Sequence, residues 1–357
     1  MFYSLVELLN SIKVFPYYFI SPLIYSYGNA AEQIFLVSRE KKLKNKKIII
    51  LDYSYFCNFL KIKIANKNLL KDVVINNQKQ RNKNVLFISL ELLVFIEFFI
   101  RRSFIIFIKD RLKFTTKELD RFPYIGLKKL YSTNDTQKKY QFVNELAINQ
   151  SHILLNDEAI KFCKKNLKNL NLEESKMVTL HVRDSNYKND GSKRNYRNSD
   201  INNYIELINF YIQNDYKVIR IGEKNCNKIN YNHKNFIDYP SSNFQSSLID
   251  LYLIYISDLF IGTSSGPRSV AEMFTKPTLI TNLDDLSDFP IKNSDRTIFK
   301  KFFKKDNKNK LDLTKLDEIS YNLYNPELFL DDFVFEENSP EELYEAGKEF
   351  LNNYDKN

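Results

Sequence analysis

One short segment of the sequence has the residue types that bind an anionic group. An apolar run leads into Gly-Thr-Ser-Ser-Gly at 262–266, and Pro267 then stands where the first turn of a helix is expected. Small residues let a ligand approach the backbone, and the free N–H groups at the start of a helix favour phosphate. The hydroxyls of Ser264 and Ser265 add hydrogen-bond donors. The segment therefore predicts a phosphate site, with a helix-capping serine in a tight turn as the alternative.

The same segment also spells Gly-x-Ser-x-Gly, the pattern around the nucleophile of many serine hydrolases. In that fold the catalytic histidine follows the serine along the chain. The three histidines of this sequence, His152, His181 and His233, all precede Ser264. We therefore interpret the segment as a binding turn and not as a nucleophile.

A second polar cluster, His181-Val182-Arg183-Asp184, ends the strongest predicted strand, and Tyr187 follows it. Side chains alternate along a strand, so His181 and Arg183 are expected on the same side. An arginine at a strand end can hold a diphosphate through paired hydrogen bonds. We interpret the cluster as the partner of the Ser-Ser turn in a phosphate clamp. A structural ion pair between Arg183 and Asp184 is the alternative.

Two glycine-containing turns supply further candidates. The segment 220–222 (RIG) closes a third strand, and Gly222 marks either the close approach of a ribose or base, or a plain turn. In the N-terminal half, the segment 25–32 leaves a strand and opens a helix. Asn29 or Glu32 is expected to address an acceptor hydroxyl there, with a helix-capping turn as the alternative.

Acidic residues give no clear metal signal. Asp250 begins an apolar helix and faces either a ligand or solvent. The pairs Asp284-Asp285 and Asp331-Asp332 resemble the metal-binding acids of some sugar transferases, but they stand in polar stretches and are expected in solvated turns. We therefore expect no bound metal.

Several other chemistries lack their motifs. The chain contains neither a P-loop pattern nor Gly-x-Gly-x-x-Gly, and it has only 7 glycines. Its three cysteines, Cys57, Cys163 and Cys226, lie far apart without a Cys-x-x-Cys pair, which argues against a disulfide framework or a structural zinc site. No RNA-binding signature accompanies the basic residues.

Strand-like and helix-like segments alternate around these residues, the pattern of a parallel α/β architecture. In the second half, the expected strands are 177–182, 216–221, 236–239, 259–262 and 278–282, and the expected helices are 199–214, 246–256 and 267–274. In the first half, helices are expected at 28–42 and 56–63 and strands at 23–26, 48–52 and 72–75. The second half therefore predicts a doubly wound unit, in which ligands sit at the carboxyl ends of the strands.

A length of 357 residues suits two α/β lobes. We expect an N-terminal lobe, a connecting helix, a C-terminal lobe and a helical tail, at 1–150, 151–175, 176–310 and 311–357. Lys and Arg number 53 against 44 Asp and Glu, a formal net charge of +9. This excess suits an anionic partner, although a general compositional drift explains it equally well.

Two apolar segments bear on membranes. Residues 1–24 are apolar but contain Glu7 and Lys13, so no cleaved signal peptide is expected. The run 85–100 holds Glu91 and Glu97 and is shorter than the roughly 20 residues that span a bilayer. Because basic residues follow, the run fits either a buried helix with a basic end or a helix on an anionic membrane surface, and the first is favoured.

Six segments, in this order, resemble a bacterial family of surface-polysaccharide glycosyltransferases. More remotely they resemble the fucosyltransferase-like members of the GT-B superfamily, which has two Rossmann-like lobes with a cleft between them. The segments are FTTKEL at 114–119, LHVRD at 180–184, YRNSDINNYIELI at 196–208, VIRIG at 218–222, the stretch 249–274 and ENSPEEL at 337–343.

The resemblance implies a nucleotide-sugar donor held mainly by the C-terminal lobe. The arginine that holds the donor's β-phosphate and the serines that assist it correspond to Arg183, Ser264 and Ser265. A Gly-Asn turn near the reacting centre resembles Gly28-Asn29, but the glutamine that commonly follows is lacking here. The candidate donor-binding residues are thus His181, Arg183, Tyr187, Arg220, Gly222, Thr263, Ser264, Ser265 and Gly266, and the candidate catalytic residues are Arg183, Glu32 and Asn29.

These expectations combine into a metal-independent glycosyltransferase without a cofactor, which moves a sugar from a nucleotide-diphosphate donor to a hydroxyl of a glycan or lipid-linked glycan. We expect it in the cytoplasm, peripherally on the inner face of the cell membrane, and without a nucleic-acid partner. Two alternatives stay open. One is a nucleotide-sugar epimerase or hydrolase on the same fold, and the other is a non-catalytic binder of nucleic acid or membrane surfaces.

Overall fold

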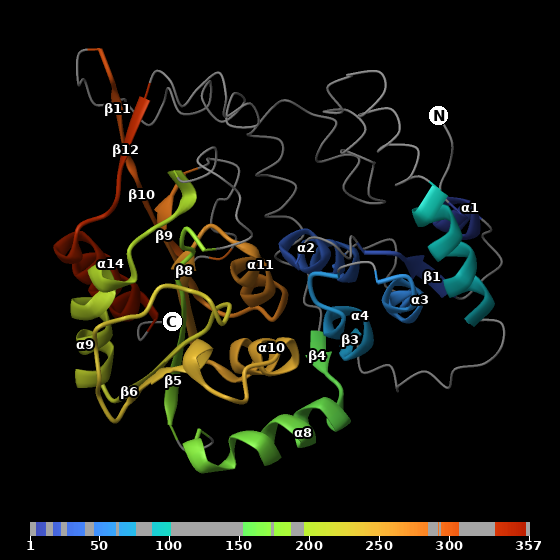
Figure 1. Ribbon diagram of the computed structural model, residues 1–357, viewed down its shortest axis with the longest axis horizontal. Coiled ribbons are helices and arrows are strands. Elements are labelled where there is room, and N and C mark those ends of the chain that lie inside the picture. Colours follow the sequence, from blue (N-terminus) through green and yellow to red (C-terminus); the bar gives the residue numbers. More distant parts are fainter. Residues whose placement is uncertain are drawn as a thin grey trace. The chain divides into compact units, whose positions relative to one another are not determined.

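The computed structural model describes residues 5–11, 17–22, 27–39, 46–61, 64–75, 88–100, 153–172, 175–186, 196–284, 292, 294–306 and 333–354. The chain divides into two compact units, Met1–Asn156 and Asp157–Asn357 (Figure 1). The division falls close to residue 150, where the sequence predicts the end of the first lobe. The cleft between two lobes stays a prediction.

A six-stranded sheet forms the centre of the second unit, in the order β10-β9-β8-β5-β6-β7. Every neighbouring pair is parallel. The strands are β5 (Lys176–His181), β6 (Tyr216–Arg220), β7 (Phe236–Asp238), β8 (Leu259–Thr263), β9 (Thr278–Leu283) and β10 (Arg296–Phe299). Counted along the chain this is the order 6-5-4-1-2-3 of a doubly wound fold. The predicted α/β class with a parallel sheet is therefore confirmed.

Helices cover both faces of this sheet. They are α8 (Asp157–Leu167), α9 (Ile205–Gln213), α10 (Ser247–Ile256), α11 (Gly266–Met273) and α14 (Pro340–Tyr354), and the 3₁₀ turns η3 (Lys168–Leu170), η5 (Ile201–Tyr204) and η6 (Tyr239–Ser241) join them. Helices α9 and α14 lie on one face and α10 and α11 on the other (Figure 1). Strands β5 to β9 and helices α9 to α11 lie where the sequence predicts them. Three strands were not expected: β10 and the strands at Lys301–Lys304 and Phe333–Glu336, the last of which lies in the stretch expected to be a helical tail.

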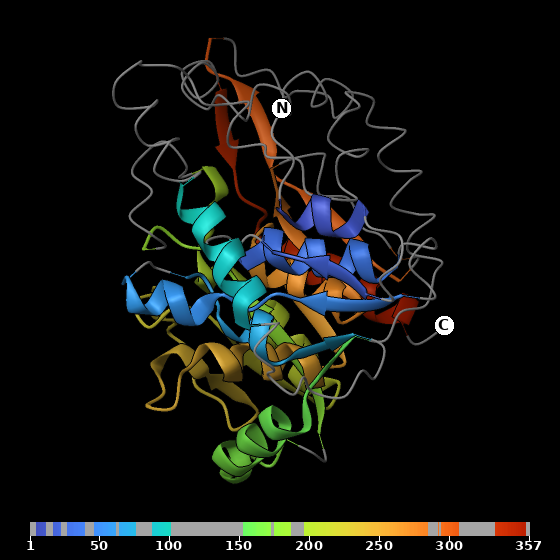
Figure 2. The same ribbon diagram turned by 90° about the vertical axis from the view of Figure 1, so that its right-hand side faces the viewer.

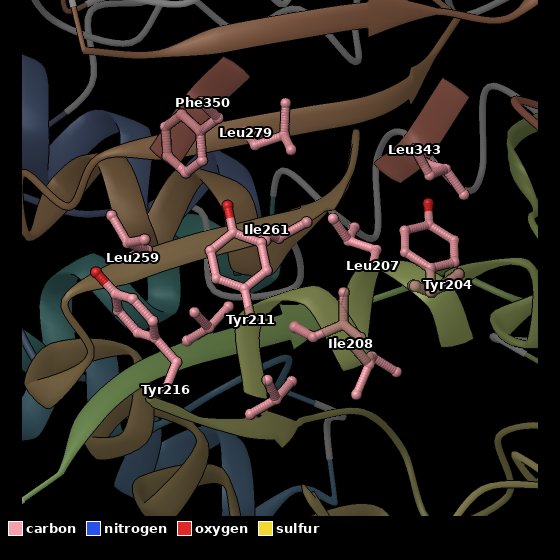
Figure 3. Close-up of a cluster of buried hydrophobic side chains, with 14 of the residues drawn as sticks. Tyr204, Leu207, Ile208, Tyr211, Tyr216, Leu259, Ile261, Leu279, Leu343 and Phe350 are labelled. Carbon is pink, nitrogen blue, oxygen red and sulfur yellow. The ribbon is translucent and has the colours of Figure 1, made fainter. Parts of the chain in front are cut away.

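The core of the second unit lies between the sheet and the pair α9 and α14 (Figure 3). Apolar residues at helical spacing in α9, such as Leu207 and Tyr211, meet alternating residues of the strands, such as Ile261. Gly347 lets α14 approach α9, since a Cβ there would lie 2.1 Å from Leu207 Cδ1. The Tyr211 hydroxyl donates to the Gly347 carbonyl at 3.1 Å, so burial of this tyrosine leaves its oxygen satisfied.

A two-stranded antiparallel ribbon extends from the end of β10. It consists of β11 (Lys301–Lys304) and β12 (Phe333–Glu336), and Figure 2 shows it projecting away from the sheet. The rings of Phe302 and Phe335 meet across the ribbon at 4.9 Å. A capping box, in which Ser339 and Glu342 exchange hydrogen bonds with each other's backbone N–H, then begins α14.

The first unit is smaller in described structure. It contains α1 (Leu5–Ser11), β1 (Tyr17–Ile20), α2 (Tyr27–Ser38), β2 (Lys47–Ile50), α3 (Ser54–Phe59), α4 (Asn68–Lys71), β3 (Val73–Ile75), β4 (Ile153–Leu155) and helical residues 88–100. Strands β1 and β2 are parallel, and β3 and β4 are antiparallel. Val6 of α1 is buried in the core of this unit, so the apolar N-terminal segment is part of the fold. The strand expected at 23–26 lies outside the described residues.

The helix at 88–100 differs from the buried helix that the sequence favours. Val94 and Phe95 are buried, but one face of the helix is exposed. Its exposed side chains are Ile88, Leu92, Leu93, Ile96, Phe99 and Ile100. The acidic residues point inward instead, because Glu97 accepts the Leu5 N–H at 2.9 Å and Glu91 accepts the Asp52 N–H at 3.2 Å. Within the described ranges, no helix combines the length and hydropathy needed to cross a membrane.

Candidate functional site

Strands β5 and β8 are adjacent at the point where the strand order reverses, which is where doubly wound sheets bind ligands. His181, the last residue of β5, pairs with Gly262 of β8. A Cβ on Gly262 would lie 2.5 Å from the His181 carbonyl oxygen. Glycine is therefore required here because the two backbones approach closely, and this approach brings the two predicted polar segments together.

Two hydrogen bonds join the end of β5 to the turn after β8. Ser265 Oγ lies 3.0 Å from His181 Nδ1 and also donates to the Thr263 carbonyl at 3.1 Å. The Arg183 N–H donates to Thr263 Oγ1 at 3.1 Å. The polar segments that the sequence predicts at one edge of the sheet thus lie at that edge and hydrogen-bond with each other.

The imidazole of His181 is neutral at physiological pH. Burial, followed by the positive charges of Arg220 and Arg183, lowers the pKa of His181 to about 3. A histidine in this state is a hydrogen-bonding group and a poor general base. Its structural partner is the Ser265 hydroxyl.

Helix α11 begins directly after this turn. Ser265 occupies the N-cap position with extended backbone, but its side chain makes no capping hydrogen bond. Its hydroxyl is instead directed to His181 and Thr263. Pro267 stands in the first turn, as the sequence predicts. Ser265 is therefore the N-cap residue, as in the alternative interpretation, but it lacks the capping hydrogen bond. In the first turn Pro267 has no N–H, and the Arg268 N–H donates to the Ser265 carbonyl at 3.1 Å.

Arg183 is buried, with 5% of its surface exposed. Its Nη1 donates to the side-chain oxygen of Asn198, and its carbonyl accepts the Ser199 N–H at 2.9 Å. The neighbouring Asp184 accepts the backbone N–H groups of Asn186 at 2.9 Å and Asn227 at 2.6 Å. One carboxylate oxygen of Asp184 thereby holds the loop after β5, and the other joins this loop to the loop after β6.

Further cations that the sequence did not single out lie beside Arg183. Arg197 Nη2 donates to the Ser264 carbonyl at 2.9 Å, and its Nε lies 3.5 Å from an Asp284 carboxylate oxygen. Lys300, directly after β10, is 4% exposed. Burial lowers the pKa of Lys300, while nearby Glu337 and Asp284 act to raise it and Arg183 to lower it.

Asp284 corrects a prediction. The sequence places it in a solvated turn, but it is buried and forms an ion pair with Arg197. Arg197 and Asn198 belong to a segment that carries the family resemblance, which is the one signal that could have identified them. Lys300 stands among several lysines, and nothing local distinguishes it.

Arg220 lies at the end of β6 with 1% of its surface exposed. Its guanidinium contacts Asp238 Oδ1 at 3.1 Å, the Asn227 carbonyl at 2.7 Å and Cys226 Sγ at 3.1 Å. These partners give Arg220 a structural role in the loop after β6. A Cβ on Gly222 would make ordinary contacts, 3.5 Å from Pro240 Cγ, so the chain's own packing does not require a glycine there.

The remaining candidates are less informative. Tyr187 lies outside the described residues. Asp250 has one buried carboxylate oxygen without a hydrogen-bond partner among the described residues, and burial, followed by the charge of Glu223, raises its pKa well above the ordinary value. Asn29 is exposed and Glu32 is half-buried, both within helix α2 of the first unit.

Metal ligands and hollows give little further guidance. In the part of the chain that the structure describes, no group of three or more His, Cys, Asp or Glu side chains is arranged to hold a metal ion. A surface hollow of about 600 Å³ lies between β10 and α14, and none of the predicted site residues lines it. The site at the ends of β5 and β8 is therefore defined by its polar groups and not by that hollow.

Comparison with known proteins gives one structural similarity. The chain is similar to ADP-heptose LPS heptosyltransferase II of E. coli, with a TM-score of 0.43 and 10% sequence identity, over 94% of this chain and 99% of that chain. No protein-family model matches the sequence, and no curated protein matches it significantly. The function therefore has to be argued from the site.

Proposed function

We propose that this protein is a glycosyltransferase that moves a sugar from a nucleotide-diphosphate donor to a hydroxyl of a surface glycan, without a metal ion. The observation that carries the proposal is that the His181 side chain and the Arg183 backbone N–H both hydrogen-bond with residues 263–265, where β5 and β8 lie side by side. The Arg183 guanidinium donates to Asn198, whose neighbour Arg197 donates to the Ser264 carbonyl of the same turn. Doubly wound sheets bind nucleotides at this position. The resemblance of the same residues to a diphosphate clamp supports the choice of donor.

The chemistry required of such a site is stabilisation of negative charge. As the bond from the sugar to the diphosphate breaks, charge grows on the departing oxygen. The guanidinium of Arg183 and the Gly266 N–H at the start of α11 are proposed to bind this charge more strongly in the transition state than in the ground state. His181, Ser265 and Gly266 are proposed to line the same donor site. Ser264 is proposed as the hydroxyl donor, because the Ser265 hydroxyl already donates to the Thr263 carbonyl.

Activation of the acceptor needs a base. The carboxylate of Glu32 is proposed to remove the acceptor proton, with Asn29 orienting the hydroxyl. His181 is a poor choice for this role, because its pKa is lowered to about 3. The neutral imidazole is instead proposed to keep the Ser265 hydroxyl in place.

A melting-temperature screen tests the donor class. UDP-, GDP- and ADP-sugars are expected to raise the melting temperature of the wild-type protein, because each carries a diphosphate. CMP-sugars carry one phosphate and serve as the matched control, with a smaller expected shift. Equal shifts with CMP- and UDP-sugars, or none with any of them, would contradict a diphosphate clamp.

Analysis of the products separates transfer from its nearest alternative. Incubation with the donor that gives the largest shift is expected to yield a glycosylated acceptor and free nucleoside diphosphate. An epimerase would instead return an isomeric nucleotide-sugar, and a hydrolase would release free sugar even in the absence of acceptor. Chromatography distinguishes all three.

A lipid-linked glycan acceptor at the inner membrane surface is the second part of the proposal. It is supported by the exposed apolar face of the helix at 88–100, which carries Leu92 and Ile96. The chain continues with Arg101 and Arg102, and the net charge of +9 suits anionic lipid headgroups.

Sedimentation with vesicles tests this attachment. Binding to phosphatidylglycerol vesicles is expected to exceed binding to phosphatidylcholine vesicles, to weaken in high salt and to fall in an Ile96→Glu variant. Phe162→Glu is the matched control, because it replaces an exposed apolar residue on another helix. Equal loss in both variants, or salt-sensitive binding to DNA that exceeds binding to vesicles, would contradict membrane attachment.

A further inference from the structure

The segment Tyr196–Asn198 reaches both halves of the candidate site. Asn198 accepts a hydrogen bond from the Arg183 guanidinium, beyond the end of β5. Its neighbour Arg197 donates to the carbonyl of Ser264 at 2.9 Å, in the turn after β8. The position of one short segment therefore affects the orientation of Arg183 and the position of the serine turn together.

Lys300, which lies between β10 and β11, contacts this segment from a distant part of the chain. Its N–H donates to the Leu283 carbonyl at 3.0 Å, which fixes its backbone beside the end of β9. Its Nζ donates to the carbonyls of Tyr196 at 2.8 Å and Asn198 at 2.5 Å. Two hydrogen bonds from one ammonium group therefore fix the backbone of the segment on either side of Arg197.

The burial of Lys300 indicates that these bonds matter. The side chain is 4% exposed, and burying a charged amine costs free energy unless strong hydrogen bonds compensate. The carbonyls of Tyr196 and Asn198 are neutral acceptors, which form charge-assisted hydrogen bonds with an ammonium group. A surface lysine with a solvated amine would not need this arrangement.

Other contacts also restrict the position of the segment, but they do not replace the hydrogen bonds of Lys300. The Arg197 Nε lies 3.5 Å from Asp284, and the ring of Tyr196 packs against Phe335 at 5.4 Å. Both contacts are made by side chains, and the adjacent Ser199 N–H donates to the Arg183 carbonyl at 2.9 Å. The carbonyl groups of Tyr196 and Asn198 are fixed by Lys300, and the backbone path sets where the Asn198 side chain begins.

We propose that Lys300 is a positioning residue for the donor site, which fixes the segment Tyr196–Asn198 so that Asn198 orients the guanidinium of Arg183 toward the donor's diphosphate. This inference rests on the proposed function, since it assigns Arg183 to the diphosphate. Lys300 acts through the segment and not through contact with the donor.

Hydrogen exchange and pyrophosphate affinity, measured on the full chain, test the proposal. In Lys300→Met, amide exchange at 196–199 is expected to accelerate in the ligand-free protein, and affinity for inorganic pyrophosphate is expected to fall roughly tenfold or more. Lys300→Arg, which keeps the charge and the donors, is expected to restore much of the affinity. Lys301→Met is the matched control, because the Lys301 amine pairs with Glu342 at 2.8 Å and not with the segment.

A double-mutant cycle separates positioning from direct contact. If Lys300 acts through Asn198, the variant with both Lys300→Met and Asn198→Ala binds pyrophosphate about as weakly as the weaker single variant. If the losses of binding free energy in the two single variants add fully in the double variant, the positioning role is wrong and Lys300 contacts the phosphate directly. If Lys300→Met fails to fold, Asn198→Ala alone must reduce affinity without lowering the melting temperature of the whole protein, and an unchanged affinity overturns the proposal.

The outcomes distinguish this inference from the proposed function. Accelerated exchange at 196–199 with unchanged pyrophosphate affinity overturns the positioning role and leaves the donor site standing. Absence of pyrophosphate binding in the wild-type protein overturns the donor site, and the positioning role falls with it. If amide exchange at 196–199 is unchanged in Lys300→Met, Lys300 does not fix the segment, whatever the affinity for pyrophosphate.

Discussion

Two arginines stand at the carboxyl ends of adjacent parallel strands, and their surroundings differ. Arg220, at the end of β6, contacts a carboxylate of Asp238, a backbone carbonyl and a thiol. Arg183, just beyond the end of β5, donates to the neutral amide oxygen of Asn198. Both are buried, so exposure does not separate them.

The difference lies in what each strand end faces. The β6 end is closed by the loop that follows it and by the neighbouring strand β7, since Cys226 and Asn227 of the loop and Asp238 of β7 all bond to Arg220. The β5 end adjoins the serine turn and the start of α11, where polar groups from several strands meet. The same residue type therefore stabilises a loop at one strand end and is proposed to bind a ligand at the next.

Replacement of Arg183 tests the β5 side and has the largest expected effect. Arg183→Ala is expected to lower the rate of sugar transfer roughly 100-fold or more, because one donor to the developing charge is lost. The variant is expected to stay folded, with a loss in stability of about 1.5–3 kcal/mol, the usual range for a hydrogen bond to a charged group. Initial rates and urea unfolding measure the two quantities.

Arg296→Ala is the control for that experiment. Arg296 is the first residue of the edge strand β10, so it lies at the amino end of a strand and not at a carboxyl end, and its guanidinium pairs with the exposed Glu349 at 3.2 Å. Its loss should leave the transfer rate near that of the wild type. A transfer rate near wild type in Arg183→Ala would contradict the clamp.

Replacement of Arg220 is expected to have the opposite profile. Arg220→Ala removes a fully buried partner of Asp238 and is expected to lower the free energy of unfolding by about 3 kcal/mol. Affinity for pyrophosphate, measured by calorimetry below the melting temperature, should change little by comparison. A stable Arg220→Ala protein that no longer binds pyrophosphate would place Arg220 in the donor site.

The two glycines at these strand ends provide a second, smaller contrast. Gly262→Ala would bring a Cβ to 2.5 Å from the His181 carbonyl, and relief of that clash is expected to cost about 2 kcal/mol of stability. Gly222→Ala meets only ordinary contacts and is expected to change stability by less than about 0.5 kcal/mol. Equal melting temperatures of the two variants would argue against close approach of β5 and β8.

Much of the second unit could be predicted because its signals are local. Strands such as Leu259–Thr263 are continuous apolar runs, and Gly266 and Pro267 follow directly to begin α11. The rule for parallel sheets then places His181 and Ser265 at the same edge, where they are found 3.0 Å apart. Their role in donor binding stays a prediction.

What the sequence could not predict depends on contacts between distant residues. Lys300 differs from its neighbours only because β10, an edge strand with half-buried side chains, brings it to the segment Tyr196–Asn198. The helix at 88–100 was expected to be buried because it is apolar. Its two carboxylates instead point toward the protein interior, where they accept hydrogen bonds from the N–H groups of Leu5 and Asp52.

Replacement of Asp250 has the smallest expected effect. Asp250 lies in α10 and is affected by Glu223 of the loop after β6. One of its carboxylate oxygens is buried without a partner among the described residues, and burial followed by Glu223 raises its pKa well above the ordinary value. Ionisation is thus less favourable in the folded protein than in the unfolded chain. The wild type therefore loses stability as the pH rises from about 4, the ordinary pKa of an aspartate, through the raised pKa.

An Asp250→Asn variant lacks this loss, since its amide does not ionise. Its melting temperature should exceed that of the wild type by a few degrees at pH 8, and the two should converge near pH 4. Scanning calorimetry from pH 4 to 8 measures the difference. A constant difference across the range would mean that Asp250 titrates normally. A lower melting temperature of the variant at pH 8 would mean that the loop after β6 stabilises the ionised carboxylate of Asp250 in the wild type. The buried charge of Asp250 would then be compensated by its surroundings, as that of Arg220 is.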